Sequence, residues 1–343
     1  MVQKLTLPIE HSSGKQQAQV HCVIVGFSAY KNNKEKKIYD SDGNSDIVQN
    51  INPYLVNAPN ILIKRRTDAI CGVSEMVYGN KPTDGGFLLL DEDEKEKIVK
   101  DNPLAEKWVR QFIGAEEFLN GKKRWCLWLV GANPSELRKC KLVIEKIEKV
   151  KNFRLKSKKA ATRKLADIST LFAEIRQPNT NYILIPSTTS GNRKYIPIGF
   201  INKNVIASNA THIIPNATLY HFGVLTSNVH MAWMRAVCGR LGNGYRYSKD
   251  IVYNNFIWAN PTPKQKKTIE NVAQEVLDAR KLYSDSTLAD LYDPNTMPPE
   301  LVNAHNKLDN AVKEAYGTKG FETEEETVES LMKMYKEAID KKA

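Results

Sequence analysis

The sequence predicts an α+β fold: a small mixed or antiparallel sheet domain with helices, followed by a helical C-terminal unit. Between residues 171 and 225, short runs rich in β-branched and aromatic residues alternate with Asn, Gly, Pro and Ser, a pattern typical of short strands joined by turns. After Trp258 the apolar residues take the three-and-four spacing of amphipathic helices. We therefore expect a leader at 1–57, a sheet domain at 58–258 and a helical unit at 259–343.

The first part of the chain alternates predicted strands and helices. The run "VHCVIVGFSAY" at 20–30 predicts a buried strand, and the polar stretch at 32–46 predicts a hairpin turn or strand exit. Two helical patterns lie between 91 and 114, and the second opens with Asn102 as a cap and Pro103 in the first turn.

A strand and a long helix are predicted next. "RWCLWLV" at 124–130 has the composition of a strand. Asn133 and Pro134 then supply a helix start. The apolar residues of this helix keep a three-and-four spacing at Leu137, Cys140, Ile144, Ile147 and Val150.

The sheet domain and the C-terminal helices follow. The strand-like runs lie at 171–176, 181–186, 194–200, 204–209, 211–215 and 219–225. A helix is predicted at 226–240. The C-terminal unit should contain three amphipathic helices, at 262–283, 298–317 and 323–339, the first capped by Thr262 and the last opened by a Thr323 to Glu326 capping box.

The charge balance indicates a polyanionic partner. Lys and Arg outnumber Asp and Glu by 50 to 39, a formal net charge of +11, and the excess peaks between Arg138 and Lys164. A surplus of this size suits nucleic acid, because each neutralised phosphate releases a counterion. The alternative is that the basic helix presents a solvated face without a partner.

The composition indicates a cytoplasmic globular protein. The chain has 343 residues, 41% of them hydrophobic, but no apolar run approaches the roughly 20 residues that cross a bilayer. The N-terminus lacks the pattern of a signal peptide, so no membrane partner is expected. The five cysteines are odd in number and scattered, which favours buried thiols over disulfides or a metal site.

No catalytic constellation is recognisable. "INPYLVNAPN" at 51–60 contains Asn-Pro-Tyr, but not the Asn-Pro-Pro-Tyr loop with which amino-methyltransferases grip a flipped adenine. Neither the glycine segment at 84–87 nor that at 242–246 both follows a predicted strand and opens a predicted helix, so these residues are interpreted as turn glycines. The six histidines show no metal-ligand spacing. We expect no active site, metal or cofactor in this chain.

Several segments, in order, resemble a known family. They include "VHCVIVGFS", "INPYLVNAPN", "MVYGNKPTDGG", "YIPIGF", "MAWMRAVCGRLGNGYRYSKDIVYNNFIW" and "LADLYDPNTMPPELVNAHNKLDNAVKEAYG". Together they are similar to the C-terminal part of large bacterial adenine-N6 DNA methyltransferases of type IIG restriction-modification systems. The resemblance implies that 1–57 holds the last strand of a methyltransferase sheet, that 58–258 is a DNA target recognition domain, and that 259–343 is a helical tail.

The resemblance also implies partners. We expect the chain to be a fragment or truncated copy that binds double-stranded DNA and is inactive alone. A missing N-terminal methyltransferase portion, in some relatives preceded by a nuclease, would bind S-adenosylmethionine. The alternative is a non-catalytic structural or protein-interaction fragment with a helical docking tail.

Two groups of residues are candidates for DNA contact. Base edges are read by bidentate side chains, and phosphates are held by Lys and Arg. By position in two loops and by analogy with the family, the base-reading candidates are Asn192, Arg193, Lys194, Arg176 and Gln177. The resemblance places Gly191 and Asn192 where many relatives carry Glu-Arg. The phosphate candidates are Lys156, Lys158, Lys159, Arg163, Lys164, Arg246 and Lys249, with Tyr247 and Ser248 beside the last two.

Overall fold

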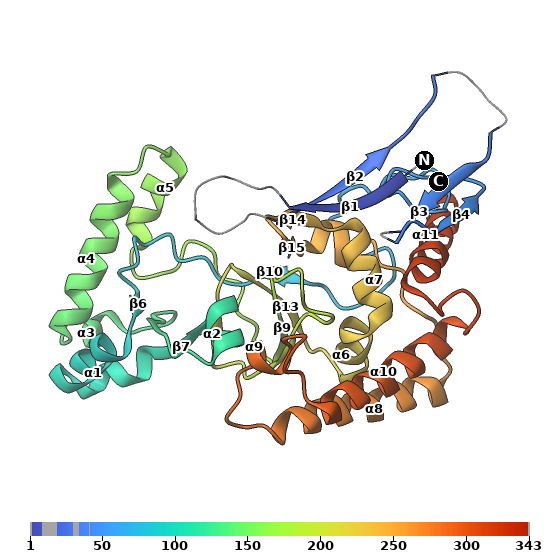
Figure 1. The fold of residues 1–343 in the computed structure, drawn as a ribbon. Helices are drawn as coiled ribbons and strands as arrows, with labels where there is room; N and C mark the ends of the chain where they lie inside the picture. Colours follow the sequence, from blue (N-terminus) through green and yellow to red (C-terminus); the bar gives the residue numbers. More distant parts are fainter. Residues whose placement is uncertain (1, 9–18, 30–33, 41, 342–343) are drawn as a thin grey trace.

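A computed structural model describes residues 2–8, 19–29, 34–40 and 42–341, which form four small sheets and a set of helices (Figure 1). The mixed α+β class predicted from the sequence is confirmed. None of the helices within these residues is both long and apolar enough to span a membrane.

The N-terminal sheet has the strand order β2-β1-β3-β4. Its members are β1 (Val2–Pro8), β2 (Gln19–Val25), β3 (Lys36–Tyr39) and β4 (Ser45–Val48). The polar stretch predicted as a turn joins β3 to β4 in an antiparallel hairpin, in which Asp40 accepts bonds from the backbone of Asp42 and Asn44; residues 30–33 and 41 lie outside the described residues.

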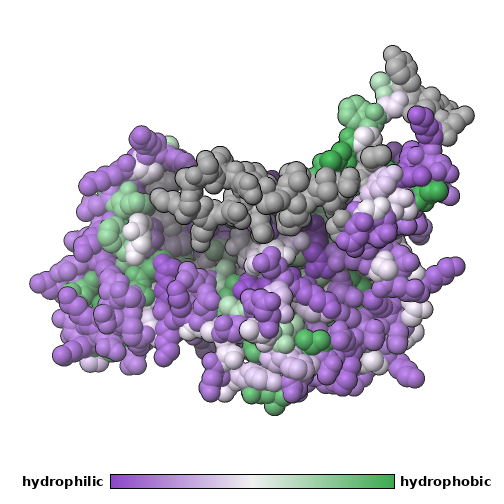
Figure 2. Space-filling model, viewed as in Figure 1, coloured by the Kyte–Doolittle hydropathy of each residue, from purple (hydrophilic) through white to green (hydrophobic). Residues whose placement is uncertain are grey.

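The strand predicted at 20–30 is present, but the prediction that it is buried is wrong where its side chains are described. Val23, Ile24 and Val25 are between 43% and 48% exposed, and Phe27 is 92% exposed. Because consecutive strand residues point to opposite faces of the sheet, both faces of β2 are exposed at this end of the strand. Figure 2 shows hydrophobic surface over this strand.

A second sheet carries a helical arm, at the left of Figure 1. Its strand order is β12-β7-β8-β6. The strands are β6 (Leu89–Leu90), β7 (Val109–Ile113), β8 (Trp125–Leu127) and β12 (Ile206–Ala207). The arm's helices are α1 (Glu92–Asp101), a 3-10 helix (Pro103–Trp108), α2 (Ala115–Asn120), α3 (Pro134–Leu137), α4 (Lys141–Leu155) and α5 (Ala160–Lys164).

Two predictions for the arm are corrected. Asn102 and Pro103 do open a helix, but residues 109–113 form the strand β7, because β8 pairs with it on one side and β12 on the other. The predicted long helix is interrupted between Leu137 and Lys141. The strand predicted at 124–130 is confirmed as β8.

The central sheet is antiparallel, with the order β11-β9-β13-β5. Its strands are β5 (Val77–Tyr78), β9 (Tyr182–Pro186), β11 (Gly199–Ile201) and β13 (Thr211–Pro215). A small third unit pairs β10 (Thr188–Thr189) with the hairpin β14 (Gly239–Leu241) and β15 (Gly244–Arg246).

Two of the six strand-like runs are not strands. Residues 219–225 belong to helix α6 (Leu219–Thr226), and 171–176 contributes only an isolated bridge between Lys81 and Glu174. Short apolar runs fit a buried helix as well as a buried strand, and here α6 packs on helix α8 rather than pairing with the sheet.

The predicted helices after residue 225 are confirmed. They are α7 (Asn228–Val237), α8 (Pro263–Lys281), α10 (Pro299–Tyr316) and α11 (Glu324–Asp340), with a short α9 (Leu288–Leu291). The caps at Thr262 and Thr323 form as predicted. One hydrophobic core contains residues of the sheet domain and of α8, α10 and α11, so the core is continuous across the predicted boundary at 259.

Three histidines lie inside this fold as neutral rings. His212, His230 and His305 each use one ring nitrogen in a hydrogen bond, to Ser187, Tyr247 and Tyr292 respectively. Their other ring nitrogens are buried without a partner among the described residues. Burial lowers the pKa of His212 to about 4 and that of His230 to about 3, and it lowers the pKa of His305 well below the usual value.

These histidines predict acid destabilisation. Below pH 6.5 the unfolded chain binds protons that the folded chain does not, so stability falls as the pH falls from 6.5 toward 4. Each ring should cost about 1.4 kcal/mol per pH unit in this window. Denaturant unfolding at pH 7.5, 6 and 5 measures the effect. A free energy of unfolding that stays constant from pH 7.5 to 5 would contradict it.

Candidate functional site

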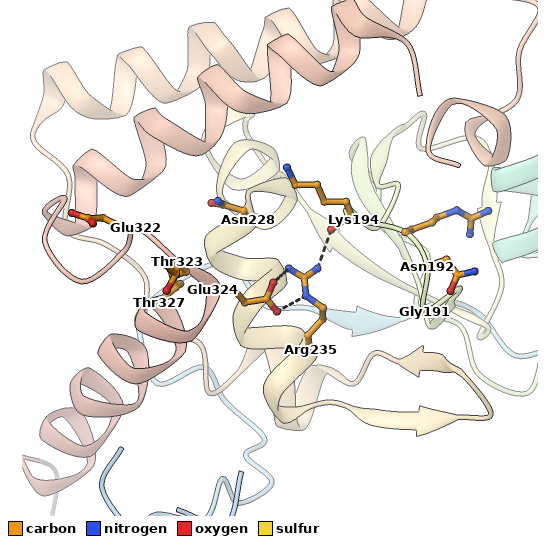
Figure 3. A pocket seen from close by; sticks show the side chains of 10 residues that line it. Gly191, Asn192, Lys194, Asn228, Arg235, Glu322, Thr323, Glu324 and Thr327 are labelled. Carbon is orange, nitrogen blue, oxygen red and sulfur yellow. Dashed lines mark hydrogen bonds and ion pairs between the residues drawn. The ribbon is translucent and has the colours of Figure 1, made fainter. Parts of the chain in front are cut away.

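The loop at residues 190–194 connects β10 to the segment that leads into β11. Asn192 and Lys194 are exposed, whereas Arg193 is half-buried. Burial lowers the pKa of the Arg193 guanidinium, with Asp293 opposing the shift, and its Nε has no hydrogen-bond partner among the described residues. With Asn228, Arg235 and the start of α11, the loop lines a cavity of about 310 Å³ (Figure 3). The loop therefore carries an exposed amide, an exposed ammonium and a half-buried guanidinium whose Nε lacks a partner among the described residues.

The β14–β15 hairpin lies directly against this loop. β15 pairs with β10 through Thr188 and Arg246, and a Cβ on Gly191 would lie 2.1 Å from the backbone oxygen of Asn243. Only glycine allows so close an approach at position 191. The exposed Arg246 thus lies beside the loop. Arg240 stacks on Tyr245 with 3.9 Å to the ring centroid and, because consecutive strand residues alternate, lies on the opposite face of the hairpin from Arg246. Arg240 was missed by the sequence analysis, although the turn glycines beside it predicted a turn.

Arg176 and Gln177 are used inside the protein. The Gln177 amide donates to the backbone oxygens of Lys203 and Val205 and accepts from Asn80 and Ala207. The Arg176 guanidinium pairs with Glu174 and donates to the backbone oxygen of Gly79. Because these bonds occupy both side chains, Arg176 and Gln177 connect segments of the domain in this conformation. We therefore do not include them among the residues proposed to read bases.

The arm carries an exposed basic group, defined as Lys156, Lys158, Lys159, Arg163 and Lys164. All five side chains are exposed, and within the described part of the chain none forms an ion pair. Arg163 donates to the backbone oxygens of Ser157 and Lys158, which closes the turn between α4 and α5. Figure 2 shows a mostly hydrophilic surface over α4 and α5.

A buried arginine shapes the backbone beneath the arm's basic group. Arg154 is completely buried, and its five hydrogen bonds go to the backbone oxygens of Pro82, Thr83, Leu165, Ile168 and Leu171 at 2.8 to 3.0 Å. All the donors of a guanidinium are thereby satisfied. In the sequence, the basic group lies between Arg154 and three residues whose carbonyls Arg154 binds, Leu165, Ile168 and Leu171. Arg154 therefore fixes the backbone on both sides of the basic group.

Lys249 is less suited to phosphate binding than the arm. Its side chain is 17% exposed and lies 3.5 Å from Asp250, which also pairs with Arg65 at 2.7 Å. The residue lies in a π-helical turn at Lys249–Tyr253. Tyr247, next to it, is buried and bonded to His230. Because Asp250 already neutralises the Lys249 charge, a phosphate would stabilise it little. We therefore do not include Lys249 among the residues proposed to bind phosphates.

The exposed basic group of the arm can bind a polyanion, and the 190–194 loop can form directed hydrogen bonds. Among the described residues, no group of three His, Cys, Asp or Glu side chains is placed to hold a metal ion. A sheet domain with a polar loop, an exposed basic arm and a packed helical unit defines a protein of the class that binds nucleic acid.

The comparisons with known proteins identify the family. The model described as MmeI, target recognition domain, matches residues 57–260, and that of MmeI, C-terminal domain, matches residues 261–341. The chain belongs to this family.

Two relatives cover nearly all of the chain. DNA methyltransferase A of Bacillus subtilis (strain 168) is 39% identical over 330 residues, which is 96% of this chain and 37% of that protein. The structure of the type IIL restriction-modification enzyme MmeI in complex with DNA matches with a TM-score of 0.89 and 44% identity, over 99% of this chain and 46% of that one. The chain therefore spans less than half the length of either relative.

Substitution of Arg154 should destabilise the arm. In Arg154→Lys an ammonium has three donors and cannot reach five carbonyls, so buried carbonyls lose their partners at about 1 to 3 kcal/mol each. We expect a loss of roughly 3 kcal/mol in denaturant unfolding and faster hydrogen exchange at 165–171. Arg138→Lys, at an exposed arginine on the same arm, is the control and should change stability by less than about 0.5 kcal/mol. Equal effects of the two substitutions would contradict the role given to Arg154.

Proposed function

We propose that this chain is the DNA target recognition part of an adenine-N6 DNA methyltransferase. The observation that carries the proposal is the exposed basic group on the arm, free of ion pairs among the described residues, in a chain whose family is that of target recognition domains. The DNA complex of the relative with 44% identity supports double-stranded DNA as the partner.

The arm supplies affinity without sequence preference. Lys156, Lys158, Lys159 and Lys164 point their charges into solvent, so binding to phosphates releases counterions and breaks no internal bond. Arg163 adds a fifth charge at the same turn. Arg246 of β15 provides a further phosphate contact next to the 190–194 loop, on the evidence of its exposure.

The 190–194 loop supplies sequence preference. Asn192 can pair with two atoms of adenine, and Arg193 or Lys194 with the O6 and N7 of guanine. The Arg193 side chain is half-buried, and its Nε is buried without a hydrogen-bond partner among the described residues, so the guanidinium loses less hydration on binding a base than a fully exposed one does. This property favours Arg193 as the principal reader.

Methyl transfer belongs to the longer protein. S-adenosylmethionine would bind in a portion outside these 343 residues, because the chain has no glycine loop of the cofactor-binding type. In this proposal the chain positions DNA for chemistry performed elsewhere in the polypeptide.

The alternative function, an interaction fragment with a helical docking tail, is less well supported. Such a tail needs a free apolar face. Here the buried residues of α8, α10 and α11 share a single core with the sheet domain, and α8 packs on α6 and on α10. The apolar faces of these helices are thus occupied within the chain.

Two substitutions separate phosphate binding from base reading. Replacing Lys158 and Lys159 by Ala should weaken binding equally on all duplexes and reduce the salt slope by about one unit per lost contact. Arg193→Ala should instead cost about 1 to 3 kcal/mol on the preferred duplex and relax the preference at one base pair. Competition binding against singly substituted duplexes at several salt concentrations measures both effects.

Lys264 and Lys267, exposed at the start of α8, provide the control pair for the arm. Their replacement by Ala removes the same charge and should leave the salt slope nearly unchanged. If Arg193→Ala lowers affinity uniformly while the Lys158 and Lys159 pair alters base preference, the two roles are reversed. An equal loss from both lysine pairs would mean that net charge alone drives binding.

The cofactor prediction is tested directly. Isothermal titration of the chain with S-adenosylmethionine should give no heat beyond dilution, because the residues that would cradle the cofactor are absent from its sequence. The same titration with S-adenosylhomocysteine serves as a second probe of the site. Saturable binding of either compound in the micromolar range would overturn the assignment of methyl transfer to another portion of the protein.

A further inference from the structure

We infer that helices α10 and α11 are positioning elements for the 190–194 loop, so that residues over 100 positions downstream determine how sharply bases are distinguished. The inference rests on the proposed function for its reading step. Its structural basis is a pair of anchors at the consecutive residues Lys194 and Tyr195, where the loop ends.

The first anchor is a buried carboxylate. The Tyr195 hydroxyl donates to Oδ2 of Asp309 at 2.7 Å, and the backbone N–H of Asn228 donates to Oδ1 at 2.8 Å. Tyr195 is 2% exposed and Asp309 is 4% exposed. Asp309 of α10 therefore joins the end of the loop to the start of α7.

Stacking and a hydrogen-bond chain reinforce this anchor. The His305 ring lies 4.0 Å from the Tyr195 ring at 18°, and its Nε2 lies 2.8 Å from the Tyr292 hydroxyl. Arg280 donates to the Tyr292 oxygen and, at 2.7 Å, to the backbone oxygen of Ile198. Because the Tyr292 oxygen accepts from Arg280, the Tyr292 hydroxyl is the donor in its hydrogen bond with His305. Through Arg280, this chain of hydrogen bonds reaches Ile198, in the segment between the loop and β11.

The second anchor is a bidentate ion pair. Arg235 of α7 binds Glu324 of α11 through two contacts of 2.7 Å, and its remaining Nη donates to the backbone oxygen of Lys194 at 3.0 Å. Figure 3 shows the Arg235 guanidinium between Glu324 and Lys194. The Glu324 carboxylate thus orients the arginine that holds the last peptide of the loop.

The two anchors fix the residue next to Arg193. Bidentate recognition tolerates displacement of only about 0.5 Å, and a loop of polar residues does not hold that precision by itself. The hydrogen bonds to the Lys194 carbonyl and from the Tyr195 hydroxyl restrict the backbone directly after Arg193. Loss of an anchor should therefore reduce discrimination more than overall affinity.

The test compares matched variants of the full chain. Tyr195→Phe and Glu324→Gln each weaken one anchor. Tyr335→Phe removes a buried hydroxyl bond between α11 and Asn255, 3.1 Å long and remote from the loop, and Glu275→Gln weakens the α8–α10 ion pair with Lys307. Asp309→Asn is the conservative variant, because an amide can accept from Asn228 and donate to the Tyr195 oxygen, whereas Asp309→Ala can do neither.

Two readouts are taken on every variant. Hydrogen exchange of residues 190–195 reports on the anchors without DNA, and selection from duplexes with a randomised centre, followed by competition binding, reports on base preference and salt slope. We expect faster exchange and about tenfold lower discrimination in Tyr195→Phe, Glu324→Gln and Asp309→Ala, with an unchanged salt slope. Tyr335→Phe, Glu275→Gln and Asp309→Asn should behave as the original chain.

The outcomes distinguish the inference from the proposed function. Unchanged exchange in all three anchor variants overturns the positioning role, whatever the DNA results. Equal loss of discrimination in Tyr335→Phe also overturns it, because the effect would then follow stability. Faster exchange in the anchor variants, with no base preference in the original chain, supports the anchors and overturns base reading by this loop.

Discussion

The burial of helix α7 on nearly every side is the constraint on which the rest of the domain depends. Seven of its ten residues are buried, and the Trp233 indole N–H donates to the backbone oxygen of Val252 at 3.0 Å. Because protein interiors are close-packed, a helix enclosed in this way fixes the distance between the central sheet, the segment at 249–258 and the C-terminal helices. At its margin, the backbone N–H of Asn228 and the guanidinium of Arg235 then have defined partners. The helical unit after residue 259 is for the same reason part of the domain's core and not an appendage.

The arm follows a different physical rule. Its core is separate from the one around α7, and a third, smaller cluster joins the two sheets, with Ile113 and Ala207 from the arm's sheet packed on residues of β9 and β13 in the central sheet. Its backbone is ordered by Arg154, a buried cation balanced by carbonyl dipoles rather than by a bonded carboxylate. A guanidinium suits this role because its five donors have fixed directions. The result is a rigid base for a row of lysines that can stay exposed. In the arm the backbone is held in place by hydrogen bonds, whereas the exposed lysine side chains remain free to adjust to phosphates.

The sequence was sufficient for features whose cause is local and insufficient for those whose partner lies far along the chain. The C-terminal helices were predicted because a cap such as Thr323 and its glutamate lie three residues apart. Residues 109–113 and 219–225 were misassigned because a short apolar run becomes a strand or a helix according to what packs on it. The exposed lysines of the arm were evident from charge density. The internal role of Gln177, and the link from Tyr195 to Asp309, depend on contacts across 28 and 114 positions, for which no local pattern exists.

This arrangement separates the positions that can vary from those that cannot. Asn192 and Arg193 lie between two fixed points, the β10 pairing with the hairpin on one side and the anchored Lys194 on the other. Side chains at these positions contribute little to the core, so their replacement changes which hydrogen bonds are offered and leaves the backbone path intact. Gly191 is the exception, since the Asn243 oxygen occupies the space of its Cβ. A larger residue there requires the β14–β15 hairpin to move. Changes in what the loop reads should therefore arise either at 192–193 alone, or at 191 together with the hairpin that faces it.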